Sequence, residues 1–174
     1  MKKTTILIIA LIVVLLLVGA VLFFLPGTPG FSSVLDPARD TLVKAEVETA
    51  ISMLQGVYAR QQAGELTPEQ AKTLGADLLR GLSYSPDGYF WADTTEGVNV
   101  VLYGRPDVEG RNRLEDKDEK GNYYVKAFLK TGMAGGGYVD YWFTKKGDTL
   151  AQPKRSYVQL FEPFNWVVGS GYYK

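Results

Sequence analysis

The chain opens with a long apolar stretch. Residues 4–35 carry no charged side chain, and residues 6–25 form an unbroken run of mostly aliphatic residues. At a rise of 1.5 Å per residue, a helix of about 20 residues crosses the hydrocarbon layer of a membrane. Lys2 and Lys3 precede the run, and the positive-inside rule places everything after it outside the cytoplasm. The pattern predicts a single-pass anchor in the cell (inner) membrane over residues 1–25, with the remaining chain periplasmic or extracellular.

A cleaved signal peptide is the alternative for this stretch. Residues 18–20, Val-Gly-Ala, make an acceptable small-residue cleavage site. The apolar run continues past that site to Leu25, which favours a retained anchor. Prolines and glycines then predict a linker over residues 26–35, which leaves residues 36–173 as one domain.

Two helices are expected next. Asp36 is a good N-cap and Pro37 suits the first helical position, so we expect a helix from there to about Ala63. Thr67-Pro68-Glu69-Gln70 has the pattern of a capping box and predicts a second helix that ends near Gly81. The first helix has apolar residues at three- and four-residue spacing, which form one stripe. They are Val43, Val47, Ala50, Ile51, Leu54, Val57 and Tyr58.

The hydrophobic period changes to two after residue 87, and the residues become aromatic and β-branched, which indicates strands. A further helix is expected over about 122–133. The pattern predicts an α+β domain, with a long helix followed by a five-stranded antiparallel sheet and flanking helices. The expected strands are 88–93, 98–103, 138–145, 154–161 and 166–173, and a turn over 94–97 joins the first two.

Composition excludes several classes of function. Nineteen basic and nineteen acidic residues give no net charge, so a nucleic-acid partner is not expected. Histidine and cysteine are absent, which removes catalytic triads, thiol nucleophiles and the commonest metal ligands, and we predict no enzyme, no metal and no cofactor. Residues 116–121 have part of a calcium-loop pattern, but Lys120 and Ala127 occupy ligand positions, so we expect a turn there.

Aromatic residues gather in the sheet region and predict an aromatic-rich cavity or core there. Strand alternation places Tyr89, Trp91 and Asp93 on one face of the first strand. Tyr89 and Trp91 are candidate pocket walls, because each combines an apolar ring with one hydrogen-bond donor. The alternative, that both rings only fill the core, stays open, and the period does not say which face lines a pocket.

Six blocks of residues, in order along the chain, resemble the single Cache domain, type 2. They are residues 87–93, Gly97, 110–112, 136–142, 153–158 and 164–172. The resemblance covers about residues 36–173. It implies a PAS-like extracytoplasmic sensor domain, found in chemoreceptors and histidine kinases, which binds small organic acids or other polar metabolites without turnover. In one departure, Leu102 and Tyr103 stand where many members have a His-Pro pair.

Arg105 and the neighbours Lys154 and Arg155 are the candidate anion-binding groups, because guanidinium and ammonium groups bind carboxylates strongly in a dry pocket. The resemblance adds Tyr157, which shares a block with Lys154. Regular alternation puts Lys154 and Tyr157 on opposite faces, so both reach one cavity only if the strand begins after Lys154 or contains a bulge.

Two tyrosines and two loop arginines complete the set of candidates. Tyr103 and Tyr141 are further candidate contacts for a ligand. Arg111 and Arg113 are expected to be solvated loop charges, because both signs of charge are densely mixed over residues 107–119.

We therefore expect an extracytoplasmic sensor domain that binds a small carboxylate and serves transmembrane signalling or chemotaxis. Its expected partners are that ligand and the membrane, and a second copy bound through the helix over residues 37–63 is a further candidate. The alternative function is a membrane-anchored interaction protein without a ligand, which dimerises through the apolar stripe that includes Val47, Ile51 and Leu54.

Overall fold

The computed structural model describes residues 31–85, 87–145 and 147–174, with side chains from Asp36 onward. The predicted anchor over 1–25 and residues 26–30 of the predicted linker lie outside these residues. Within the described part, no helix combines the length and the apolarity that crossing a membrane requires. Residues 40–174 form one compact unit, and the architecture below is that of this unit.

The described residues contain three α-helices, α2 (Phe31–Gln62), α3 (Pro68–Gly81) and α4 (Tyr124–Met133), and one short 3-10 helix, η1 (Glu162–Phe164). The predicted capping box of α3 is confirmed, because Thr67 Oγ1 accepts from the Gln70 amide at 3.2 Å and Gln70 Oε1 accepts from the Thr67 amide at 2.9 Å. The predicted start of α2 is wrong, since the helix begins five residues before Asp36 and contains Pro37. A proline removes one amide from the ladder, and here the helix continues through it.

The sheet is antiparallel throughout and follows the predicted strands closely. Its strands are β1 (Ser83–Tyr84), β2 (Gly88–Thr94), β3 (Asn99–Leu102), β4 (Gly137–Thr144), β5 (Ala151–Phe161) and β6 (Trp166–Tyr173). The order is β1-β2-β6-β5-β4, and β3 pairs with β2. The two-residue β1 was not predicted, because it is too short to show a period. The predicted α+β class and the β2–β3 hairpin are confirmed, with the Thr94 amide donating to the Val98 carbonyl at 2.8 Å.

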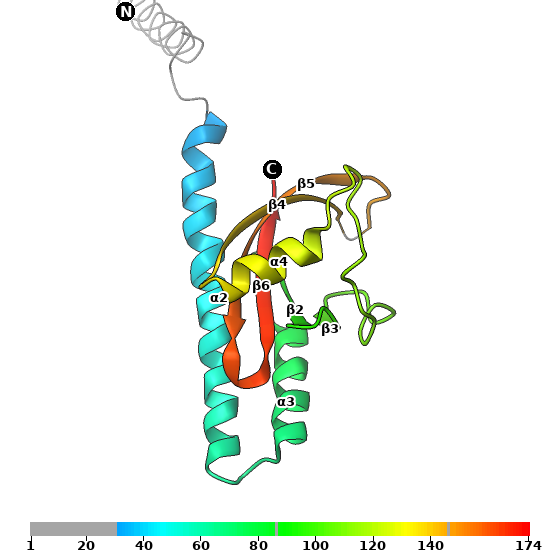
Figure 1. Cartoon of the computed structure of the whole chain (residues 1–174). Helices are drawn as coiled ribbons and strands as arrows, with labels where there is room; N and C mark the ends of the chain where they lie inside the picture. The colour runs from blue at the N-terminus through cyan, green and yellow to red at the C-terminus, as the bar shows by residue number, and fades with distance from the viewer. Residues whose placement is uncertain (1–30, 86, 146) are drawn as a thin grey trace, which may run out of the picture. The chain divides into compact units, whose positions relative to one another are not determined.

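Helices cover both faces of the sheet. The apolar stripe of α2, together with α3, packs on the face that carries Phe90 and Ala92. Helix α4 crosses the other face (Figure 1) and packs on Trp91 and Val167. The alternation predicted for β2 is therefore confirmed, and Trp91 lies on the α4 face.

The central strand β6 has two glycines on the α4 face. A β-carbon at Gly169 would lie 2.3 Å from Trp91 Cζ2, and one at Gly171 would lie 2.2 Å from Ser156 Oγ. Because neither position has a side chain, the Trp91 indole rests directly on the backbone of β6. The surface of the sheet is therefore lower at these two glycines than at the neighbouring strands, on the face that α4 covers.

Candidate functional site

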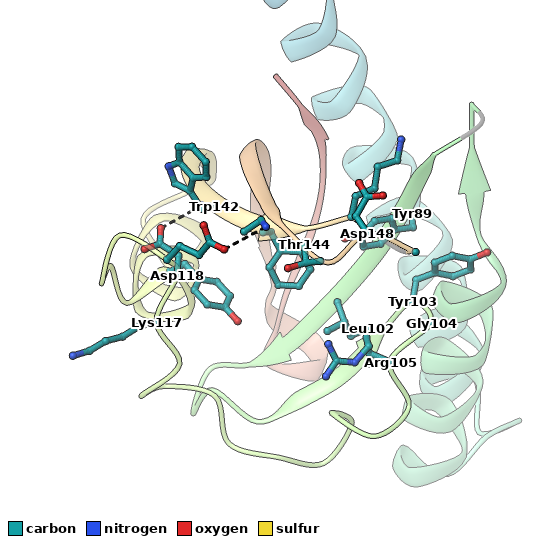
Figure 2. Close-up of a pocket in the computed structure, with 16 residues that line it drawn as sticks. Tyr89, Leu102, Tyr103, Gly104, Arg105, Lys117, Asp118, Trp142, Thr144 and Asp148 are labelled. Carbon is teal, nitrogen blue, oxygen red and sulfur yellow. Dashed lines mark hydrogen bonds between the residues drawn. The ribbon is translucent and has the colours of Figure 1, made fainter.

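Two cavities lie on the α4 face of the sheet. The outer cavity, of about 410 Å³, is formed by residues 102–105 after β3, residues 117–119 and the β4–β5 hairpin (Figure 2). The inner cavity, of about 10 Å³, has room for roughly one water molecule. It is lined by Tyr89, Trp91, Leu102, Arg113, Tyr124, Phe128, Tyr141 and Phe143. Four residues line both cavities and separate them: Tyr89, Leu102, Tyr124 and Phe143.

Stacked rings fill most of the inner cavity. Trp91 stacks on Phe128 with centroids 4.3 Å apart, and Tyr124 stacks on Tyr141 at 5.5 Å. The Tyr141 hydroxyl hydrogen-bonds to Ser156 Oγ at 3.0 Å. Burial raises the pKa of Tyr141, so its hydroxyl stays neutral. The walls are therefore apolar rings that carry a few hydroxyl groups.

Lys154 reaches this region from β5 and is only 1 % exposed. Its Nζ donates to Tyr89 Oη at 2.6 Å and lies 4.2 Å from the centroid of the Tyr89 ring. It also lies 4.9 Å from the Tyr173 ring and 5.4 Å from the Phe143 ring. Across residues 31–85, 87–145 and 147–174, no carboxylate pairs with this ammonium group. Burial lowers the pKa of Lys154 to about 7.

Arg113 is a second buried cation beside the inner cavity. Its Nη1 donates to Asp93 Oδ1 at 3.1 Å and its Nη2 donates to Tyr124 Oη at 3.1 Å. Asp93 also accepts from Asn99 Nδ2 at 2.9 Å. Burial raises the pKa of Asp93, while Arg113 and Asn99 act in the opposite direction.

The expectation that Arg113 is a solvated loop charge is wrong, since the residue is only 2 % exposed. Its backbone amide donates to the Gly97 carbonyl at 2.8 Å, and Asn112 forms a β-bridge with Val98. These bonds hold the loop against the β2–β3 hairpin and direct Arg113 inward. The feature of the sequence that could have indicated a buried arginine is Asp93, which shares a strand face with Trp91 and needs a partner when it is buried. Arg111 is exposed, as predicted.

Two donors at the inner cavity lack acceptors. Within the part of the chain that the structure describes, Trp91 Nε1 and Arg113 Nε are buried without a hydrogen-bond partner, although Arg113 Nε lies 3.6 Å from Asp116 Oδ2 in an ion pair. Buried polar groups are normally hydrogen-bonded, so each of these donors calls for an explanation. Together with Lys154, they surround the cavity with donors and positive charge. Such a site can hold a small anion.

Several charged residues of the outer cavity have partners. Arg105 pairs with Asp107 at 2.9 Å in an exposed loop, and Lys145 pairs with Asp87 at 2.7 Å. Asp118 accepts from the Trp142 amide at 3.2 Å, which ties the loop to β4 (Figure 2). Asp118 also accepts from the amides of its own turn, as expected for a turn over residues 116–121. These contacts shape the cavity wall.

Most of the predicted site residues are brought together. Tyr89, Trp91 and Tyr141 line the inner cavity, and Lys154 ends against Tyr89 at its edge. Tyr103 and Arg105 line the outer cavity instead. Tyr103 stacks on Tyr89 with centroids 5.7 Å apart, so it covers one of the four residues that separate the two cavities.

Tyr157 does not join them, and the expectation that it shares a cavity with Lys154 is wrong. Strand β5 starts before Lys154 and pairs regularly with β6, from Lys154 opposite Tyr173 to Tyr157 opposite Ser170. Residues three apart on such a strand point to opposite faces. Tyr157 lies on the α2 face, with its ring 5.1 Å from that of Tyr138.

Arg155 also lies on the α2 face. Its Nε donates to Asp40 Oδ1 of α2 at 2.9 Å, and its Nη1 donates to Asp140 Oδ2 of β4 at 2.5 Å. The Tyr172 hydroxyl donates to the same Asp40 oxygen at 3.0 Å. Burial lowers the pKa of Arg155, but the bonds to these carboxylates outweigh it and the pKa is raised overall. The neighbours Lys154 and Arg155 thus belong to different sites.

Comparison with known proteins gives consistent matches. The family described as Single Cache domain 2 matches residues 35–174. The sensor histidine kinase MctS of Rhizobium johnstonii is 32 % identical over 124 residues, which are 71 % of this chain and 26 % of that protein. The chain therefore spans about a quarter of the length of that relative.

Two solved structures have the same fold. A periplasmic sensor domain of a chemotaxis protein is 34 % identical, with a TM-score of 0.76 over 79 % of this chain and 96 % of that one. A Cache chemosensory domain described for its carboxylic acid recognition is 31 % identical, with a TM-score of 0.76 over 80 % of this chain and 95 % of that one.

Proposed function

This chain belongs to the Single Cache domain 2 family, and from that premise we propose that it senses a small carboxylate, which binds in the inner cavity. The family relationship identifies a sensor domain of the kind carried by chemoreceptors and histidine kinases, which is not an enzyme. The carboxylate and its position are the new parts of the proposal.

One observation carries the proposal: a fully buried ammonium group, Lys154, has no carboxylate partner among the described residues. An unpaired buried charge is costly, and a ligand carboxylate would supply the missing counterion. Arg113 is already paired with Asp93 at 3.1 Å and with Asp116 at 3.6 Å, so Lys154 is the buried cation that a ligand carboxylate would pair with. Trp91 Nε1 is a buried donor without an acceptor among the described residues, and it suits a carboxylate oxygen.

The roles of the site residues follow from their positions. Lys154 and Arg113 attract the carboxylate, while Tyr89, Trp91 and Tyr141 enclose the rest of a ligand with only a few carbons. The present volume of about 10 Å³ is too small for such a ligand, so the rings must move when it binds. Tyr89 and Phe143 separate the cavities, and Tyr103 and Arg105 line the outer cavity through which the ligand enters.

The membrane attachment is part of the same proposal. Residues 1–25 anchor the chain in the inner membrane, and the domain that follows lies outside the cytoplasm, as the periplasmic location of the related chemotaxis domain supports. A second copy bound through residues 37–63 would have to use the exposed face of α2. The alternative function without a ligand is disfavoured, because Val47 and Leu54 of its stripe are buried against the chain's own sheet.

Thermal unfolding of the full chain tests the proposal. A ligand that binds only the folded state raises the melting temperature. We expect a rise with at least one of acetate, propionate, lactate, pyruvate and succinate, and none with small amines. Lys154→Ala should abolish the rise and change the unliganded melting temperature by only a few degrees.

The matched control is Lys126→Ala, which removes an exposed lysine of α4 that pairs with Glu115. This variant should respond to the acids as the wild type does. The proposal fails if no acid raises the melting temperature, or if Lys154→Ala responds like Lys126→Ala.

A further inference from the structure

We propose that, above neutral pH, the inner cavity binds its carboxylate together with one proton, which comes from solvent and which Lys154 retains at that pH only while the ligand is bound. The inference rests on the proposed function, because it concerns the same site. It adds that external pH controls the sensor.

The groups that face Lys154 make a neutral environment. They are Tyr89 on β2, Tyr141 and Phe143 on β4, and Tyr173 on β6. Burial raises the pKa of each of these three tyrosines, so none is an anion near neutral pH. Helix α4 contributes two uncharged rings to the cavity, Tyr124 and Phe128. No element packed around Lys154 therefore provides an anion in contact with it, among the residues described.

The charged groups farther out do not replace a counterion. Arg113 has the same sign as Lys154, and it is paired with the buried Asp93 and with the partly exposed Asp116. Asp87 and Asp148 act on the neighbouring Tyr173, but Asp87 pairs with Lys145 and Asp148 accepts from Gln152. Lys154 therefore keeps its proton poorly in the unliganded domain. The lowered pKa of about 7 agrees with this geometry.

The proton balance of binding follows. Above about pH 7, the unliganded lysine is largely a neutral amine, and the acid arrives as a carboxylate, because free carboxylic acids of this kind ionise near pH 4–5. An opposite charge at contact distance favours the ammonium form, so the lysine takes a proton from water as the ligand binds. One N–H bond forms on the lysine, and the water or buffer acid that gives up the proton loses the corresponding O–H or N–H bond. By reciprocity, protonation and ligand binding strengthen each other.

The affinity should therefore depend on pH in one direction. Below the unliganded pKa the lysine already carries its proton, and affinity is flat. Above it, the dissociation constant rises about tenfold per pH unit, until the pH reaches the pKa of the liganded lysine. A cavity that held a permanent cation would show no such slope.

Isothermal titration calorimetry of the full chain measures the proton directly. Each acid of the thermal panel that binds is titrated, at each pH, in two buffers that hold that pH and differ in ionisation enthalpy, and the difference in heat gives the number of protons taken up. We expect about one proton per ligand at about pH 8.5 and almost none at about pH 5.5. Lys154→Arg keeps a permanent charge and should bind with no proton uptake and a flat pH profile.

Lys126→Ala is the control and should keep the wild-type proton count. If an acid binds at about pH 8.5 without proton uptake, this inference is overturned and the proposed function survives. If no acid of the panel binds at any pH, the proposed function fails and takes the inference with it. Circular dichroism checks that Lys154→Arg is folded, and if it is not, the wild-type proton count decides alone.

Discussion

Two neighbouring cations, on opposite faces of strand β5, differ in whether the chain supplies their counterions. On the α2 face, Arg155 is bonded to Asp40 and Asp140, and its pKa is raised. On the α4 face, Lys154 is more deeply buried, bonds to a tyrosine hydroxyl and has a lowered pKa. One cation has its counterions supplied by the chain, and the other has none within the described residues.

This difference separates a structural charge from a binding charge. A buried charge is tolerated in a fold when carboxylates of the same chain complete it, as Asp40 and Asp140 do for Arg155. A charge left incomplete lowers stability, and it persists where something outside the chain completes it. Sites of function are where such local violations are expected. Charge pairing therefore supports the proposal that the α4 face of the sheet binds the ligand and that the α2 face is structural.

The pH dependence of stability without ligand tests the comparison most strongly. The pKa of Lys154 is about 7 in the folded chain and 10.5 ordinarily, so the unfolded chain binds this proton more tightly. The unfolding free energy should rise as pH increases from about 7, by up to about 3 kcal/mol at pH 9.5. Urea unfolding across this range measures the rise, and Lys154→Met should remove it. An identical slope in the variant would contradict the assignment.

Equivalent substitutions on the two faces should change stability in opposite directions. At about pH 6, Lys154→Met removes a buried, unpaired charge and should raise the unfolding free energy by about 1–4 kcal/mol. Arg155→Met leaves Asp40 and Asp140 without their partner and should lower it by about 1 kcal/mol, because that pair is partly exposed. Chemical denaturation of both variants decides this. Changes of the same sign would show that the two cations are alike.

The smallest effect concerns the contact between α2 and the sheet. A double-mutant cycle with Asp40→Asn and Arg155→Met should give a coupling free energy of about 0.5–1 kcal/mol. The exposed pair Lys145–Asp87 provides the comparison cycle and should give a value nearer zero. Equal couplings would mean that the Asp40 contact adds nothing to an ordinary surface pair.

Much of the fold was predictable because each element has a clear period. The three-and-four spacing of α2 and the alternation of β2 predict which residues share a face of each element, and the packing agrees. Alternation also argued against placing Lys154 and Tyr157 in one cavity, and the regular pairing of β5 agrees with that physical argument. The resemblance alone had suggested Tyr157.

The candidate site was predicted only in part. The mixed charges of residues 107–119 wrongly predicted a solvated Arg113. Its burial depends on the β-bridge between Val98 and Asn112, which is a contact between distant parts of the sequence. Arg105 looked equally suited to an anion, yet Asp107, two residues away, already pairs with it. The division into two cavities depends on how Tyr89 and Phe143 pack, and no local pattern encodes side-chain packing.

Because Gly169 and Gly171 of β6 have no side chains, they affect how binding specificity can change within this family. From Trp166 to Ser170, β6 pairs with β2 on one side and with β5 on the other, so the peptide groups around Gly169 are engaged in the sheet. If the proposed carboxylate binds here, its selectivity depends on the surrounding side chains, which lie on separate elements. Each can be exchanged alone, so new chemical preferences can evolve without redesign of the sheet.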